Sequence, residues 1–197
     1  MRRPMIAPIA AMAAAATLAG CGINSIPTAE ENAKARWADV QNDYQRRADL
    51  IPNLVATVKA AGAQEKSILV EVTQARAAAN TVRVSADDLS DPAKMAQFDR
   101  AQSTLGLSLQ RLQEAYPELR SQGNYTTLMS QLEGTENRIT IARRDYNTAV
   151  QEYNTRIRTF PDAVGAKIFY GAKPLVPFTA TTPGAEQAPT VNFGNAS

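Results

Sequence analysis

Apolar residues recur at seven-residue spacing through most of the chain, and this spacing limits the fold more than any other feature of the sequence. Side chains seven positions apart lie on the same face of an α-helix. The first series comprises Trp37, Tyr44, Ile51, Val58, Val72 and Ala79. A second series, which begins at Val40, falls between its members and completes an apolar stripe of the coiled-coil kind. The sequence therefore predicts an all-α protein whose helices bury these stripes against one another.

Three helical segments are expected. The first covers residues 30 to 84, the second begins at Pro92 after a connection rich in Asp and Ser, and the third covers residues 124 to 160. The first segment is far longer than its partners, so we expect it to be kinked or split near Pro52 or Gly62. The sequence leaves open whether it forms one kinked helix or two helices.

Residues 1–20 have the composition of an export signal, because two arginines precede an apolar run of about 15 residues that is too short for a comfortable membrane span. A buried N-terminal helix is the alternative, but it would have to accommodate Pro4 and Pro8. The run ends in Leu18-Ala19-Gly20-Cys21, which resembles the lipobox of bacterial lipoprotein signals. That resemblance implies cleavage before Cys21 and a lipid on its sulfur.

Cys21 is the only cysteine in the chain, so it has no partner for an intramolecular disulfide. The alternative to lipidation is a free thiol after a cleaved signal, and the lipid explains the solitary cysteine better. Residues 21–29 would then be a lipidated tether that holds the fold close to the membrane. Gly22 stands where an inner-membrane retention signal would carry Asp, which favours the periplasmic face of the outer membrane over the inner membrane.

Composition excludes several classes of function. The chain has no histidine, which rules out histidine-ligated zinc or haem and nucleophiles activated by histidine. Its 21 basic residues include Arg2 and Arg3 of the leader, so the mature chain carries 19 basic and 19 acidic residues. This balance gives no electrostatic footprint for nucleic acid. We expect no cofactor, no metal and no nucleic-acid partner.

A polar stripe borders the apolar face of the third helical segment, and it is the candidate interaction site. Its members all fall within about 20° of the direction of Glu136 around the helix. One hypothesis is a hydrogen-bonded network that fixes helix register; the other is a groove for a ligand or partner. The stripe comprises Glu136, Arg143, Asn147 and Asn154.

Acidic residues at helical spacing raise the alternative of a carboxylate-based hydrolase. Such an enzyme needs two acids in a cleft with positioned donors, which a packed helical rod does not supply, so the sequence favours a non-enzymatic protein. Glu65 also falls at a core position, where we expect it to pair with Arg138 or Arg143. The candidate acid pairs are Glu133 with Glu136, and Glu65 with Glu71.

Three stretches carry a family resemblance. They are RRADLIPNLVATVKAAGAQEKSILVEVTQAR at 46–76, YPEL at 116–119 and LEGTENRITIARRDYNTAVQEYNTRIRTFP at 132–161. Together they resemble the LemA family, and the resemblance extends over nearly all of residues 30–171. We expect these residues to form the bundle and residues 172–197, rich in Pro, Thr and Ala, to form an extended or disordered tail.

The resemblance implies an elongated, antiparallel, up-and-down four-helix bundle in the bacterial cell envelope, which favours splitting the first segment in two. It brings no catalytic residues. It implies a scaffold or adaptor in membrane organisation or envelope protein assembly. The partner would be an unidentified envelope protein, for which a TPM-domain protein and a membrane metalloprotease are the candidates. A small-ligand or lipid-binding bundle is the alternative. Many relatives carry an uncleaved membrane helix where this chain has a lipobox, so their topology does not transfer.

Overall fold

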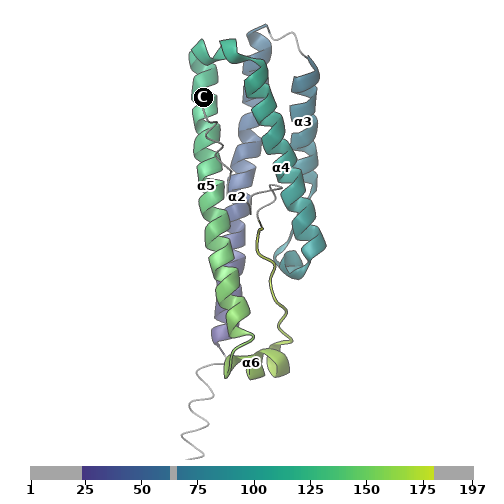
Figure 1. The fold of residues 1–197 in the computed structure, drawn as a ribbon, viewed down its shortest axis with the longest axis vertical. Coiled ribbons are helices and arrows are strands. Elements are labelled where there is room, and N and C mark those ends of the chain that lie inside the picture. Colours follow the sequence, from purple (N-terminus) through teal and green to yellow (C-terminus); the bar gives the residue numbers. More distant parts are fainter. Residues whose placement is uncertain (1–23, 63–65, 180–197) are drawn as a thin grey trace, which may run out of the picture.

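The computed structural model describes residues 24–62 and 66–179, and it confirms the all-α class. Successive long helices run in alternate directions along an elongated molecule (Figure 1). Helix α2 packs most closely on α5, and α3 packs most closely on α4. The four long helices of the described ranges are α2 (Ser25–Ala60), α3 (Lys66–Thr81), α4 (Pro92–Ala115) and α5 (Gly123–Arg156).

The long first segment is split into two helices, and the break lies at Gly62. Gly62 has a φ of +84°, a conformation in which glycine is far less strained than other residues, and its N–H donates to the carbonyl of Lys59 to close α2. Pro52 lies inside α2 and does not end it. Ile51 and Leu54 on either side of the proline are both buried, so tertiary packing holds the helix together there.

Helix α2 begins earlier than the sequence predicts. Residues 25–29, which were expected to belong to the tether, form its first turns, in which Ile26 and Ala29 are buried. Pro27 does not prevent this, because a helix leaves the N–H groups of its first turn without intrahelical partners. The expected start of α4 at Pro92 is confirmed, since the side chain of Asp91 accepts hydrogen bonds from the N–H groups of Ala93 and Lys94.

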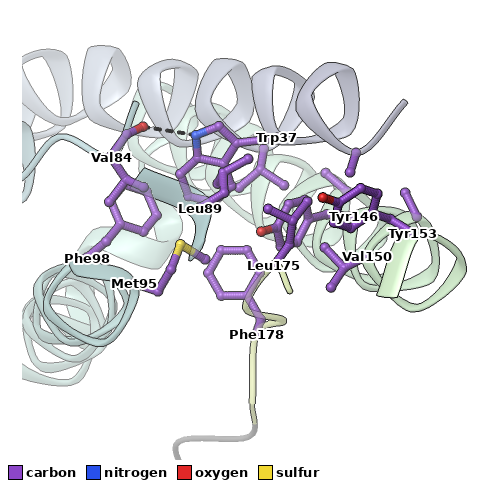
Figure 2. Packing of buried hydrophobic residues seen from close by; sticks show 14 of the residues in the cluster. Trp37, Val84, Leu89, Met95, Phe98, Tyr146, Val150, Tyr153, Leu175 and Phe178 are labelled. Carbon is purple, nitrogen blue, oxygen red and sulfur yellow. Dashed lines mark hydrogen bonds between the residues drawn. The ribbon is translucent and has the colours of Figure 1, made fainter. Parts of the chain in front are cut away.

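The core consists of two apolar clusters separated by a polar layer. The first cluster joins the N-terminal half of α2 to the C-terminal half of α5 around Trp37 (Figure 2). The second joins the C-terminal half of α2 to α3, the C-terminal half of α4 and the N-terminal half of α5. Between them lie the buried polar side chains Arg47, Asp99, Gln102 and Thr135.

After α5 the chain turns through the short helix α6 (Asp162–Gly165) and a π-helical turn, η3 (Ala166–Tyr170), at one end of the bundle (Figure 1). Residues 172–179 then run back along the first cluster without helix or strand; we call them the strap. Leu175 and Phe178 of the strap are buried. The packed fold thus extends past the boundary expected at 171, and residues 180–197 of the expected tail lie outside the described residues.

Candidate functional site

Two asparagines of α5 hold the strap by its backbone. The side-chain amide of Asn147 donates to the carbonyl of Phe178 at 2.9 Å and accepts from the N–H of Phe178 at 2.8 Å. Asn154 makes the same pair of bonds with Leu175, at 2.8 Å and 2.9 Å. Each amide therefore satisfies both backbone groups of one strap residue, as a neighbouring β-strand would.

The spacing of these residues explains why the match is possible. Seven residues advance an α-helix by about 10.5 Å. Three residues of extended chain, from Leu175 to Phe178, advance by about 10 Å. The helix and the strap therefore stay in register across two contacts. Further bonds reinforce them: the Tyr146 hydroxyl donates to the carbonyl of Val176 at 3.0 Å, and the Val176 N–H donates to Leu89 at 2.9 Å.

Arg47 of α2 is the centre of the polar layer between the two clusters. Its side chain is only 3% exposed, and it donates to Glu136 of α5 at 2.7 Å. It also donates to the side chain of Gln102 at 2.6 Å and to the backbone carbonyl of the same residue at 3.1 Å. One arginine thus connects three helices, and a buried guanidinium that is hydrogen-bonded to both neighbouring helices fixes their relative register.

Arg143 of α5 makes a second cross-helix link in the layer. Its guanidinium lies 3.1 Å from the buried carboxylate of Asp99 on α4, donates to the Tyr44 hydroxyl at 3.4 Å and covers the ring of Phe178 at 4.3 Å. Burial raises the pKa of Tyr44, and the neighbouring guanidinium groups of Arg143 and Arg47 oppose this rise. Arg143 therefore joins the polar layer to the end of the strap.

An open groove runs between α4 and α5 from the end of the strap. It contains two hollows, of about 600 Å³ and 640 Å³, which meet at Gly106 and Glu136. Apolar side chains, including Leu109, Leu132 and Ile139, form part of its lining. Most of the remaining lining consists of uncharged hydrogen-bonding groups, namely Gln102, Ser103, Gln110, Gln113, Thr126, Ser130, Thr140, Asn147, Thr148, Gln151 and Thr179.

The structure brings three members of the expected polar stripe to this groove. Glu136, Arg143 and Asn147 line it, whereas Asn154 lies farther along α5 beside Leu175. Glu136 and Arg143 belong to the cross-helix network, and the two asparagines bind the strap. Their role in binding another molecule stays a prediction.

Sequence reasoning missed Arg47, although the sequence carries a signal for it. Arg47 is seven residues after Val40 and seven before Leu54, so it occupies an apolar position of the second series. An arginine at such a position is buried only with partners. Asp99 gave a similar signal, because it lies four residues after the buried Met95.

Several expected sites lie elsewhere. Cys21 and Glu65 are outside the described residues, so lipidation and the expected pairing of Glu65 stay predictions. The two arginines proposed for Glu65 face other acids: Arg143 faces Asp99, and the Nε atom of Arg138 lies 3.9 Å from Asp43. Glu133 and Glu136, the first candidate acid pair, both line the groove, where Arg47 engages Glu136.

Within 24–62 and 66–179, no group of three or more His, Cys, Asp or Glu side chains is arranged to hold a metal ion. None of the helices in the described part of the chain combines the length and the apolar character needed to cross a bilayer.

Comparison with protein-family models gives a match that covers most of the chain. The sequence model of the LemA family matches residues 36–193, which is most of the 197-residue chain and includes the polar layer, the groove and the strap. No curated protein matches the chain at a significant level.

Proposed function

The chain belongs to the LemA family, and on that premise we propose that it is a non-enzymatic, lipid-anchored scaffold or adaptor of the cell envelope that binds extended segments of other proteins. The family is not a known enzyme family. The expected leader and lipobox support an anchor at Cys21 and a position facing the periplasm, with the outer membrane favoured. The groove between α4 and α5 supports the adaptor role.

The observation that carries the proposal is the way α5 holds the strap. Asn147 and Asn154 bind backbone groups, which every polypeptide offers, while the buried side chains Leu175 and Phe178 supply apolar contact. Recognition of an extended chain by paired backbone bonds and alternate side-chain pockets is a recurring mode of peptide binding. The α5 surface is therefore built to bind an extended segment.

The groove continues this surface beyond the strap. It begins at Phe178 and Thr179, and its lining combines amide and hydroxyl side chains with apolar ones. An extended segment of a partner can enter where the strap ends and use the same kind of contacts. The partners that the family resemblance suggests are a TPM-domain protein and a membrane metalloprotease.

Mass analysis followed by crosslinking from the same membranes tests this function. We expect the membrane-extracted protein to have a mass that begins at an acylated Cys21, and this processed form to be absent from Cys21→Ala. A photo-crosslinking residue at Gln110, which is exposed in the groove, should capture a discrete envelope protein. The matched position is Ala78, which is exposed on α3 and does not line the groove.

Capture of the same proteins from Gln110 and Ala78 would contradict a role for the groove. Capture of the chain's own residues 180–197 from Gln110 would mean that the groove serves the chain itself. An unprocessed mass would contradict the lipid anchor. The crosslinks from Gln110 would then be the remaining test of whether the groove binds a partner.

A second candidate function is binding of a small polar ligand or a lipid headgroup, and the hollow of about 600 Å³ favours it. Glu136 and Arg143 place opposite charges in its lining, and Asn147 adds an amide. Pockets of this size suit small molecules, although a largely apolar lining is more usual. This candidate predicts a bound molecule that survives purification.

Native mass spectrometry checks the ligand. We expect a defined added mass on the purified protein, and we expect Thr140→Trp, which fills the hollow from an exposed position, to remove it. Thr155→Trp is the control, because Thr155 is also exposed on α5 and lies outside the hollow. An added mass that persists in Thr140→Trp, or no added mass on the wild-type protein, would rule out this candidate.

A further inference from the structure

Exposed apolar side chains are concentrated at one end of the bundle. In the part of the chain that the structure describes, five of the eight exposed large apolar residues lie between positions 160 and 170. We call these five the apolar tip. Its members, with their exposed fractions, are Phe160 (86%), Val164 (50%), Ile168 (69%), Phe169 (67%) and Tyr170 (42%). Isolated exposed apolar residues are ordinary, but a cluster of this kind marks an interaction site.

The short helical segment at the tip buries and exposes the opposite kinds of side chain from those that a surface helix of a soluble protein buries and exposes. Helix α6 and the following π-helical turn bury the small residues Gly165 and Ala166 against the bundle. Their large side chains, such as Ile168 and Phe169, face outward. A surface helix normally buries its large apolar residues and exposes polar ones. The tip is therefore built to contact an apolar phase.

The charge around the tip suits an anionic surface. Between residues 157 and 173 the chain has three basic residues, Arg158, Lys167 and Lys173, and one acidic residue, Asp162. The three basic residues are exposed. Asp162 is turned into the fold, where it accepts a hydrogen bond from Ser25 at 2.6 Å. Aromatic side chains flanked by Lys and Arg are characteristic of surfaces that sit at the membrane interface.

The start of α2 lies at the same end of the molecule. The bond between Ser25 and Asp162 joins the first turn of α2 to α6, and both lie at the lower end of the bundle in Figure 1. Asn24 is only three positions after Cys21, and three residues of chain span about 10 Å at most. A membrane attachment in the first 21 residues therefore leaves the tip within reach of lipid headgroups.

We propose that the apolar tip inserts into the interface of an anionic lipid bilayer and holds the bundle upright on the membrane, with the groove directed away from it. This proposal rests on the membrane attachment in the proposed function, but not on its chemical form. A lipid on Cys21 and an uncleaved segment at residues 5 to 19 both enter the fold through the start of α2. The partner that the tip contacts is the lipid bilayer itself.

Quenching of tryptophan fluorescence by brominated lipids tests the tip. The protein extracted from membranes is reconstituted into vesicles of phosphatidylethanolamine and phosphatidylglycerol with brominated acyl chains. Phe169→Trp places a reporter in the tip, and Ile141→Trp places one on the side of α5, where Ile141 is 51% exposed. Trp37, the only native tryptophan, is 1% exposed and common to all samples.

We expect Phe169→Trp to be quenched about two-fold and shifted to shorter wavelength, because an interfacial helix buries its apolar face at the level of the acyl chains. The fluorescence of the control, Ile141→Trp, should be quenched and shifted by the vesicles no more than that of the wild-type protein. Position 141 lies 15 residues before the end of α5 at Arg156, which corresponds to about 22 Å of helix.

Quenching of Phe169→Trp no greater than that of Ile141→Trp would overturn the proposal. A shift to shorter wavelength that appears without vesicles and grows with protein concentration would assign the tip to a second copy of the chain, and would also overturn it. The intact mass of the same sample reports the anchor separately, so a failure of the lipid on Cys21 is distinguishable from a failure of the tip.

Discussion

Replacing Trp37 with alanine is expected to lower the free energy of unfolding by about 3–5 kcal/mol, the range for deletion of a large aromatic side chain from a core. Trp37 is 1% exposed, and its ring centroid lies 5.2 Å from that of Phe98, 5.4 Å from Tyr146 and 5.7 Å from Phe178. These rings come from α4, α5 and the strap (Figure 2). The cavity left by the indole would therefore loosen three elements at once.

The cavity, and not the lost hydrogen bond, should dominate this cost. The indole N–H donates to the carbonyl of Val84 at 3.0 Å, but that carbonyl also accepts from the side chain of Gln41 at 2.9 Å. The acceptor therefore keeps a partner when the indole is removed. Trp37→Phe retains most of the apolar area, and we expect it to cost only about 1–2 kcal/mol.

Urea unfolding followed by circular dichroism measures both variants. Leu107→Ala is the matched control, because Leu107 is an apolar residue that is 55% exposed on α4. Its expected cost is within about 0.5 kcal/mol. If Trp37→Ala shifted the unfolding midpoint no more than Leu107→Ala does, Trp37 could not be the centre of the first cluster.

The helices were predictable from the sequence because seven-residue spacing reports directly which face of a helix is buried. The break at Gly62 was among the expected sites, since the helix lengths required one. The early start of α2 was not expected, because Pro27 suggested a tether. Only the burial of Ile26 and Ala29 shows that the apolar stripe continues through the proline.

The candidate site was only half predictable, and the reason is physical. Spacing within α5 places Glu136, Arg143, Asn147 and Asn154 on one side of the helix, but it does not identify what they face. The strap shows no helical or strand periodicity of apolar residues. Pro174 and Pro177 lack the N–H groups that a helix or a strand ladder requires, so the sequence of the strap resembles that of a free tail. Its order depends on contacts with distant residues, which local patterns do not reveal.

Ending the chain at Gly171 is expected to lower the free energy of unfolding by about 2–4 kcal/mol. The truncation removes the buried side chains of Leu175 and Phe178, each of which contributes about 1.5–3 kcal/mol on burial. It also removes the paired bonds that Asn147 and Asn154 make with the strap backbone. The conformational entropy recovered by the released residues offsets part of this loss.

A chain that ends at Thr179 is the matched control, because it keeps the strap and lacks only residues 180–197. We expect its midpoint in guanidinium unfolding to equal that of the full chain. The fluorescence of Trp37 adds a local measurement: its emission should move to longer wavelength in the shorter chain alone, since the ring of Phe178 stacks on the indole at 5.7 Å.

The double variant Asn147→Ala and Asn154→Ala separates the backbone bonds from the apolar contacts. If the bonds hold the strap in place, the double variant should reproduce the shift in Trp37 emission although Leu175 and Phe178 are still present. Equal emission and equal midpoints for the chains ending at Gly171 and Thr179 would instead mean that the strap is not held by α5. The peptide-binding surface inferred from it would then lose its support, because the strap is the one extended segment seen bound there in the described residues.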